Sequence, residues 1–175
     1  MSTSCKINII EEWKTEDGVK TIVVSIYRHS DGYPEGVLSD IKVFMDNYHD
    51  PNGSIHGVDY WLMNFAFYCK LSNIFTGISL NSTFTNWFEY GYGICSESCK
   101  HGDLEYEYWI DLKKGKIKIM KFDWKKNKWK KEFEGTLKKA FEKYAKSNGY
   151  HLYKESFRIM DFVNKKEILK IFGGK

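Results

Sequence analysis

The sequence predicts an α+β domain in which helices cover one face of an antiparallel sheet. Two strand-rich regions, one at the N-terminus and one after residue 103, flank a central region with helical periodicity. Period-two alternation and β-branched residues favour strands, whereas apolar residues at three- and four-residue intervals favour helices. We therefore expect a sheet made from an N-terminal hairpin and a C-terminal meander, two central helices, and a helical segment at the C-terminal end.

The N-terminal hairpin is predicted from two apolar runs joined by turn residues. Residues 5–10 alternate and then become apolar, and residues 19–27 are rich in β-branched side chains. Between them lies Thr-Glu-Asp-Gly at 15–18, a composition typical of a tight turn.

The meander is predicted from strands at 103–112, 116–124 and 128–133. Its first strand has acidic residues on one face and its second has lysines, so we expect cross-strand Glu–Lys pairs. The first strand's other face is apolar and comprises Leu104, Tyr106, Tyr108 and Ile110.

Helices are predicted over residues 37–48, 58–71 and 135–147, and a strand followed by a helix over 157–172. The apolar stretch 60–69 is half the length needed to cross a bilayer, so it is interpreted as a buried helix. No membrane association is expected.

Length and composition favour a single domain over residues 1–175, with the lysine-rich portion 113–175 as a possible appendage. The two prolines and the lack of a Gly/Ser-rich run argue against an internal linker. The polar N-terminus does not resemble a secretory signal peptide, so a cytoplasmic location is expected, which is the host cytoplasm if the protein is viral.

The most informative stretch is the decapeptide YRHSDGYPEG at 27–36, between a predicted strand and a predicted helix. A helix N-terminus has free N–H groups and a partial positive charge that favour an anion. The Asp-Gly pair predicts a tight turn with positive φ at Gly32. We expect an anionic small molecule or nucleotide to bind here, with no cofactor, at Tyr27, Arg28, His29, Ser30, Asp31, Tyr33 and Glu35.

A structural interpretation of the same loop stands beside this one. Asp31 would then cap the turn or the helix, Arg28 would pair with Glu35, and the tyrosines would be core residues. A third interpretation is a phosphodiesterase in which His29 is the general acid or base and Arg28 steadies the phosphoryl charge. No nucleophile motif, metalloprotease motif or phosphate-binding glycine loop accompanies them, which favours a binding protein over an enzyme.

Three blocks of the sequence, MSTSCKINII, YRHSDGYPEG and GDLEYEYWIDLKKGKIKI, together resemble a family of small uncharacterised proteins from phages and bacteria. The family's pattern starts with Met-Ser-Thr-Arg, continues with Tyr-Arg-His-(Trp or Ser)-Asp-Gly-Tyr-Pro, and ends with an acidic-aromatic strand beside a lysine-rich one. The chain departs from it at Ser4, where the pattern has arginine. The resemblance implies a phage or mobile-element origin, and with it capture of a nucleotide or host defence signal as an anti-defence protein.

Charge is concentrated in one region. Residues 113–146 contain fourteen lysines and four acidic residues, a local net charge of +10 against +4 for the whole chain. Lysines interleaved with indoles suit phosphates and unpaired bases, or an acidic host protein, whereas the plainer interpretation is a solvated basic surface. The candidate surface comprises Trp124, Lys125, Lys126, Lys128, Trp129, Lys130 and Lys131.

A zinc site is a further hypothesis. Cys95, Cys99 and His101 place two thiols and an imidazole within seven residues, and a fourth ligand would come from Cys5, Cys69 or another histidine. Structural zinc sites normally show two close ligand pairs, so the alternatives are a loop with free thiols and a transient disulfide between Cys95 and Cys99.

Overall fold

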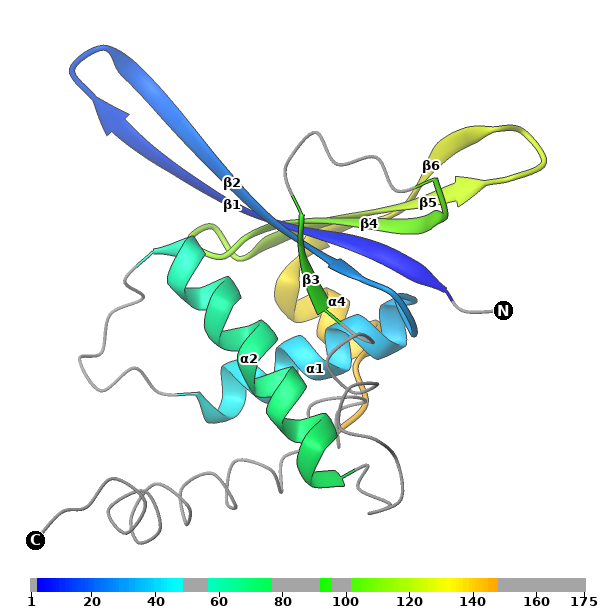
Figure 1. Cartoon of the computed structure of the whole chain (residues 1–175). Helices are drawn as coiled ribbons and strands as arrows, with labels where there is room; N and C mark the ends of the chain where they lie inside the picture. The colour runs from blue at the N-terminus through cyan, green and yellow to red at the C-terminus, as the bar shows by residue number, and fades with distance from the viewer. Residues whose placement is uncertain (1–2, 49–56, 77–91, 96–101, 148–175) are drawn as a thin grey trace, which may run out of the picture.

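The computed structural model describes residues 3–48, 57–76, 92–95 and 102–147 of the 175-residue chain. Within these residues the chain forms one six-stranded sheet and three helices, which confirms the α+β class (Figure 1). The strands are β1 (Ser4–Thr15), β2 (Gly18–Arg28), β3 (Tyr92–Cys95), β4 (Leu104–Asp111), β5 (Lys116–Asp123) and β6 (Lys128–Thr136). The helices are α1 (Pro34–Asn47), α2 (Val58–Thr76) and α4 (Leu137–Tyr144).

The strand order is β3-β2-β1-β4-β5-β6, so the predicted hairpin and meander share one sheet. They join through β1 and β4, which pair in parallel, with Ile7 opposite Tyr108. The expectation of a purely antiparallel sheet was therefore wrong at this seam. A parallel pair requires a long crossover connection, and here the chain passes through β2, α1, α2 and β3 between β1 and β4.

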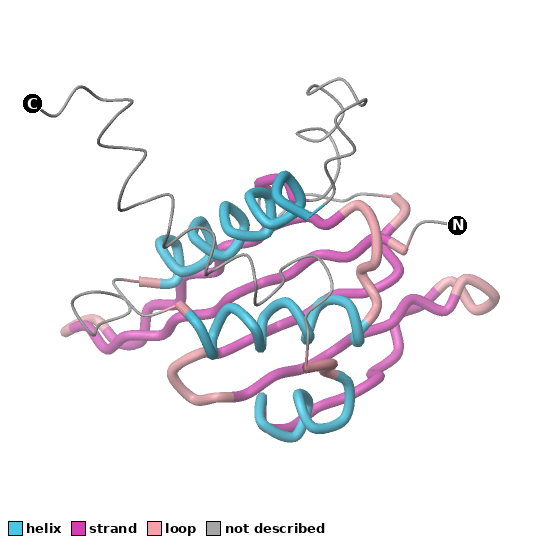
Figure 2. The backbone as a smooth tube through the Cα atoms, turned by 90° about the horizontal axis from the view of Figure 1, so that it is seen from below, coloured by secondary structure: helices cyan, strands magenta, loops and turns pink. Residues whose placement is uncertain are grey.

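All three helices lie on one face of the sheet, as Figure 2 shows from the helical side. The side chains that face them form the core: Cys5, Ile7 and Ile9 of β1 and Ile110 of β4 are fully buried. No described helix covers the opposite face of the sheet. Among the described residues, none of the helices combines the length and the hydrophobicity of a membrane-spanning segment.

The helices depart from their predicted form in two respects. α2 continues to Thr76, and its expected burial holds for only one side, since Tyr60, Met63 and Phe67 are each more than half exposed. α4 is shorter than predicted and begins after Thr136, whose hydroxyl accepts a hydrogen bond from the Lys139 backbone N–H.

The two-stranded ends of the sheet project beyond the helices on opposite sides (Figure 1). One is the β1–β2 hairpin and the other is the β5–β6 hairpin. The described meander has the strands that were expected, but its lysines pair differently. Lys113 and Lys114 of the β4–β5 turn form ion pairs with Glu11 and Glu12 of β1, so these lysines join the meander to the neighbouring hairpin.

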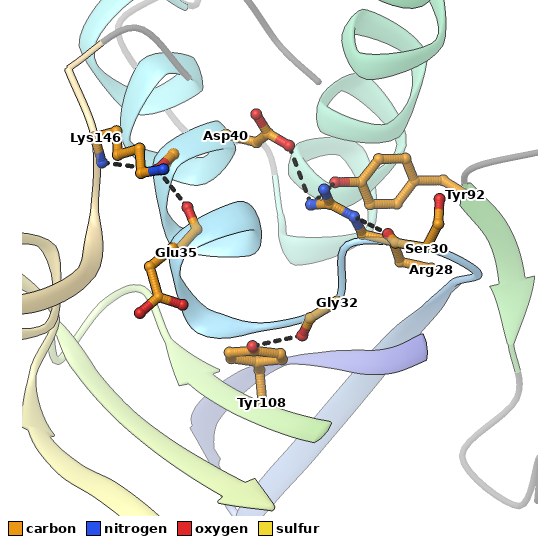
Figure 3. Close-up of polar contacts among 9 residues, drawn as sticks. Arg28, Ser30, Gly32, Glu35, Asp40, Tyr92, Tyr108 and Lys146 are labelled. Atoms are coloured by element: carbon orange, nitrogen blue, oxygen red, sulfur yellow. Dashed lines mark hydrogen bonds and ion pairs between the residues drawn. The ribbon is translucent and has the colours of Figure 1, made fainter. Parts of the chain in front are cut away.

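The loop between β2 and α1 is fixed to the sheet by its backbone. The Gly32 N–H donates to the Thr3 carbonyl at 2.8 Å, and the Gly32 carbonyl accepts from the Tyr108 hydroxyl at 2.7 Å (Figure 3). A Cβ at Gly32 would lie 2.8 Å from the backbone of β1, so a larger residue does not fit at this position. The left-handed residue of the turn is Asp31, with φ 55°, and not Gly32 as the sequence suggested.

Arg28, the last residue of β2, points into the core and is 1% exposed. Its Nη1 donates to Asp40 of α1 at 3.0 Å and to the Tyr92 hydroxyl of β3 at 2.9 Å, and its Nε donates to the Ser30 carbonyl at 2.8 Å (Figure 3). Asp40 is itself fully buried. One guanidinium thus joins a strand end, a helix and the edge strand of the sheet.

Gly36 has no side chain that would crowd the Arg28 guanidinium. A Cβ there would lie 3.3 Å from Nη2 of Arg28 and 2.3 Å from the Asp31 carbonyl oxygen. Nη2 is buried and has no hydrogen-bond partner among the described residues. Arg28 is therefore enclosed on the helix side by the first turn of α1.

Replacing Asp40 by alanine leaves the Arg28 charge buried without its counter-ion. We expect Asp40→Ala to lower the free energy of unfolding by about 3–5 kcal/mol. Asp46→Ala is the matched control, because it breaks the exposed Lys42–Asp46 pair of the same helix, and it should cost less than about 1 kcal/mol. Urea denaturation measures the free energy of unfolding of both variants. Equal decreases would show that the buried pair stabilises the fold no more than the exposed pair does.

Candidate functional site

The structure divides the predicted loop site between the two sides of the sheet. Arg28 faces the core, whereas Tyr27 and His29 face away from it. The expectation that Arg28 meets an external anion was wrong, because the side chain is enclosed and paired with Asp40. The same geometry separates Arg28 from His29, so the two side chains do not form the pair that the phosphodiesterase interpretation requires.

The outward side of the loop forms a hydrogen-bonded group with the start of β4. The Tyr27 hydroxyl donates to an Asp103 carboxylate oxygen at 2.8 Å and lies 3.2 Å from Nδ1 of His29. Burial, together with the Asp103 hydrogen bond, raises the pKa of Tyr27 to about 12. The phenolic proton is directed to Asp103, so the Tyr27 hydroxyl oxygen joins the carboxylate and the imidazole in one group.

The other predicted loop residues have structural positions. Ser30 supplies the carbonyl that accepts from Arg28, and Asp31 holds the left-handed turn. Tyr33 occupies the N-cap position of α1 without a side-chain cap, and its carbonyl accepts from the backbone of Gly36. The Glu35 carbonyl accepts from Ser39, whose hydroxyl also accepts from the Lys146 N–H at 2.7 Å (Figure 3).

The lysine-rich candidate surface lies on the projecting part of the β5–β6 hairpin. We name residues 121–131 the basic arm. Within the arm, the ring of Phe122 packs against two tryptophans. Its centroid lies 4.6 Å from that of Trp124 and 5.2 Å from that of Trp129. The indoles of Trp124 and Trp129 are 56% and 37% exposed, so this is an aromatic cluster that water reaches.

The turn of the basic arm is held by Asp123. Its carboxylate accepts from the backbone N–H groups of Lys125 and Lys126 at 3.1 and 3.2 Å and pairs with Lys130. The Lys130 ammonium lowers the pKa of Asp123. Asn127 completes the turn in the left-handed conformation, with φ 48°.

The arm's lysines fall into two groups. Lys130 pairs with Asp123 and Lys131 pairs with Glu134 at 2.8 Å, so each has a neutralising partner. Lys125, Lys126 and Lys128 are exposed at the tip and have no ion pair within the part of the chain that the structure describes. The tip therefore presents ammonium groups beside accessible indole rings. Sequence reasoning identified these residues, but it missed Phe122, the ring that both tryptophans contact.

The zinc hypothesis is tested only at one of its residues. Cys95 is buried in β3, opposite Ser25, while Cys99 and His101 lie outside the described residues. No group of three or more His, Cys, Asp or Glu side chains within the described ranges could hold a metal ion. The site at Cys95, Cys99 and His101 stays a prediction.

The two cysteines suggested as a fourth ligand lie in the core near Arg28. Both thiols are fully buried, and burial raises the pKa of Cys5 to about 12 and that of Cys69 well above its usual value. Neither forms a disulfide. Each is a protonated thiol at neutral pH, whereas a zinc ligand must be a thiolate.

These thiols should resist alkylation as long as the chain is folded. At pH 8, iodoacetamide should leave Cys5 and Cys69 unmodified, because both are inaccessible and protonated. Both should become fully modified in 6 M guanidinium chloride, and peptide mass spectrometry reads each site separately. Rapid native labelling of Cys5 would contradict the packing of Gly32 against it.

Comparison of the chain with protein-family models, with curated proteins and with solved structures gave no match.

Proposed function

We propose that this chain is a binding protein for single-stranded nucleic acid and that the basic arm is its contact surface. The observation that carries the proposal is the exposed cluster of Trp124 and Trp129 around Phe122, ringed by lysines without ion pairs. Aromatic rings on such surfaces stack on unpaired bases, and lysines meet the backbone phosphates.

The residue types favour a single strand over a duplex. Rings stack on a base only where its face is not covered by a neighbouring base pair. Sequence readout of a duplex relies on arginine, asparagine and glutamine at base edges, and the whole chain has two arginines, of which Arg28 is buried. We therefore expect binding with little sequence preference.

Because Arg28 is buried, the site at residues 27–36 offers no exposed guanidinium to an anionic ligand. An anionic ligand there would meet the outward group of Tyr27, His29 and Asp103, in which a carboxylate opposes an anion. The basic arm has the charge that this group lacks. The phage or mobile-element setting, with a role against host defence, stays a prediction from the sequence resemblance.

The electrostatic part of the proposal is tested at the tip lysines. We expect the double variant Lys126→Gln/Lys128→Gln to bind a fluorescein-labelled oligothymidine more weakly than the unaltered chain. The slope of log K against log salt should become shallower by about 1.4, since each lost phosphate contact removes about 0.7 for a single strand. Fluorescence anisotropy between 50 and 300 mM NaCl measures both quantities.

The control for this experiment is Lys14→Gln/Lys20→Gln, which removes two exposed lysines from the opposite hairpin. It changes the net charge by the same amount but leaves the basic arm intact. The affinity and the salt slope should therefore stay near the values of the unaltered chain. If both pairs of substitutions weaken binding alike, the interaction follows net charge and the assignment to the basic arm is wrong.

The stacking part of the proposal is tested at Trp124, the more exposed indole. Trp124→Ala should weaken binding of the same oligomer by about 1–3 kcal/mol, because one base loses its stacking partner. The salt slope should stay unchanged, since no charge is removed. Trp13→Ala on the other hairpin, at 36% exposure, is the matched control and should bind normally. Binding unaffected by Trp124→Ala would eliminate stacking at the tip.

A further inference from the structure

A concave surface lies beside the basic arm, and most of its lining belongs to the sheet face that no described helix covers, with Lys139 of α4 also in the lining. It is a hollow of about 710 Å³, and we name it the sheet hollow. Its lining runs across four strands and includes Ile10 of β1, Trp109 and Asp111 of β4, Lys116 and Lys118 of β5, and Glu134 of β6.

Strand alternation places an indole and an ammonium side by side in the sheet hollow. Trp109 and Lys118 are directly opposite each other in the β4–β5 pair. Their neighbours Tyr108 and Ile119 are fully buried in the core, so Trp109 and Lys118 point to the opposite face. Trp109 is half-buried and Lys118 is exposed.

The charges of the sheet hollow leave it positive. Its carboxylates are already occupied, since Asp111 lies 3.4 Å from the Lys114 ammonium and Glu134 lies 2.8 Å from that of Lys131. Lys116 and Lys118 are exposed and form no ion pair with any described residue. Each carboxylate therefore has two lysines around it, because Lys116 is the cross-strand partner of Asp111 and Lys118 is that of Glu134. The sheet hollow keeps an excess of lysines beside an aromatic ring, which resembles the arm's tip.

The sheet hollow and the basic arm lie along one ribbon. Phe122 follows Lys118 by four residues on β5 and points to the same face, which separates them by roughly 13 Å. Met120 lies between them, and Lys131 of β6 is its cross-strand partner. A backbone that leaves the tip along this face passes Met120 and Lys131 and then Lys118 before it reaches Trp109.

We infer that the sheet hollow is the second contact for the same single strand, with the tip holding one end and Trp109 stacking on a base at the other. This inference rests on the proposed function. It predicts a binding site longer than the tip alone offers, in the range of about 4–16 nucleotides found for comparable surfaces. Short oligomers then use the tip, and longer ones use both contacts.

The test compares oligothymidines of 5 and 15 nucleotides on Lys116→Gln/Lys118→Gln, with Lys14→Gln/Lys20→Gln as the charge-matched control. The 15-mer should bind the sheet-hollow variant about tenfold more weakly at 50 mM NaCl, with a salt slope shallower by about 1.4. The 5-mer should bind it within twofold of the unaltered chain. Circular dichroism of each variant checks that the fold is retained.

A second measurement does not depend on any variant. Ultraviolet crosslinking of a 15-mer with 4-thiothymidine at every position should modify the tryptic peptide 101–113, which contains Trp109, as well as a peptide of the arm. The 5-mer should crosslink to the arm alone.

The outcomes separate the two proposals. If the 15-mer binds the sheet-hollow variant normally and does not crosslink to peptide 101–113, the inference is overturned while the arm remains the contact surface. If neither oligomer binds the unaltered chain, the proposed function fails and the inference fails with it.

Discussion

The architecture depends on the buried Arg28–Asp40 pair. A guanidinium withdrawn from water costs several kcal/mol unless its geometry is satisfied, so the elements that supply its partners must be in place together. Those partners come from β3, which the sheet ladder already places beside β2, and from α1 and the loop after β2, which the ladder alone would not hold in position. The same pair fixes which side of β2 faces the helices and therefore which side chains of the following loop face out.

This orientation explains why the loop misled the sequence interpretation. Arg28 and His29 are adjacent, and adjacent residues of an extended chain point to opposite sides. A signal for the burial of Arg28 was nevertheless present. Asp40 follows Val37 by three residues and precedes Phe44 by four, so it lies on the apolar face of its helix, and a carboxylate there requires a buried cationic or hydrogen-bonding partner.

Local patterns predicted most of the elements, because strand alternation and helical spacing are local properties. The hairpins, the position of α1 and the apolar face of β4 were all recoverable in this way. The parallel pairing of β1 with β4 was not, since it joins residues about a hundred positions apart and no turn sequence specifies it. A hint lies in Asn8, which is fully buried on the face away from the helices and accepts from Ser25 at 2.6 Å, as befits a central strand.

Lysine content alone gave a misleading picture of where the positive charge acts. The lysines of the β4–β5 turn are neutralised by Glu11, Glu12 and Asp111, which come from strands that the pairing of β1 with β4 brings together. The same reasoning applies to Lys130 and Lys131 near the base of the arm. Lysines without an ion pair among the described residues include those of the tip and of the sheet hollow, and both groups adjoin an aromatic ring. The register of the sheet, more than the number of lysines, therefore determines which lysines are left without a neighbouring carboxylate.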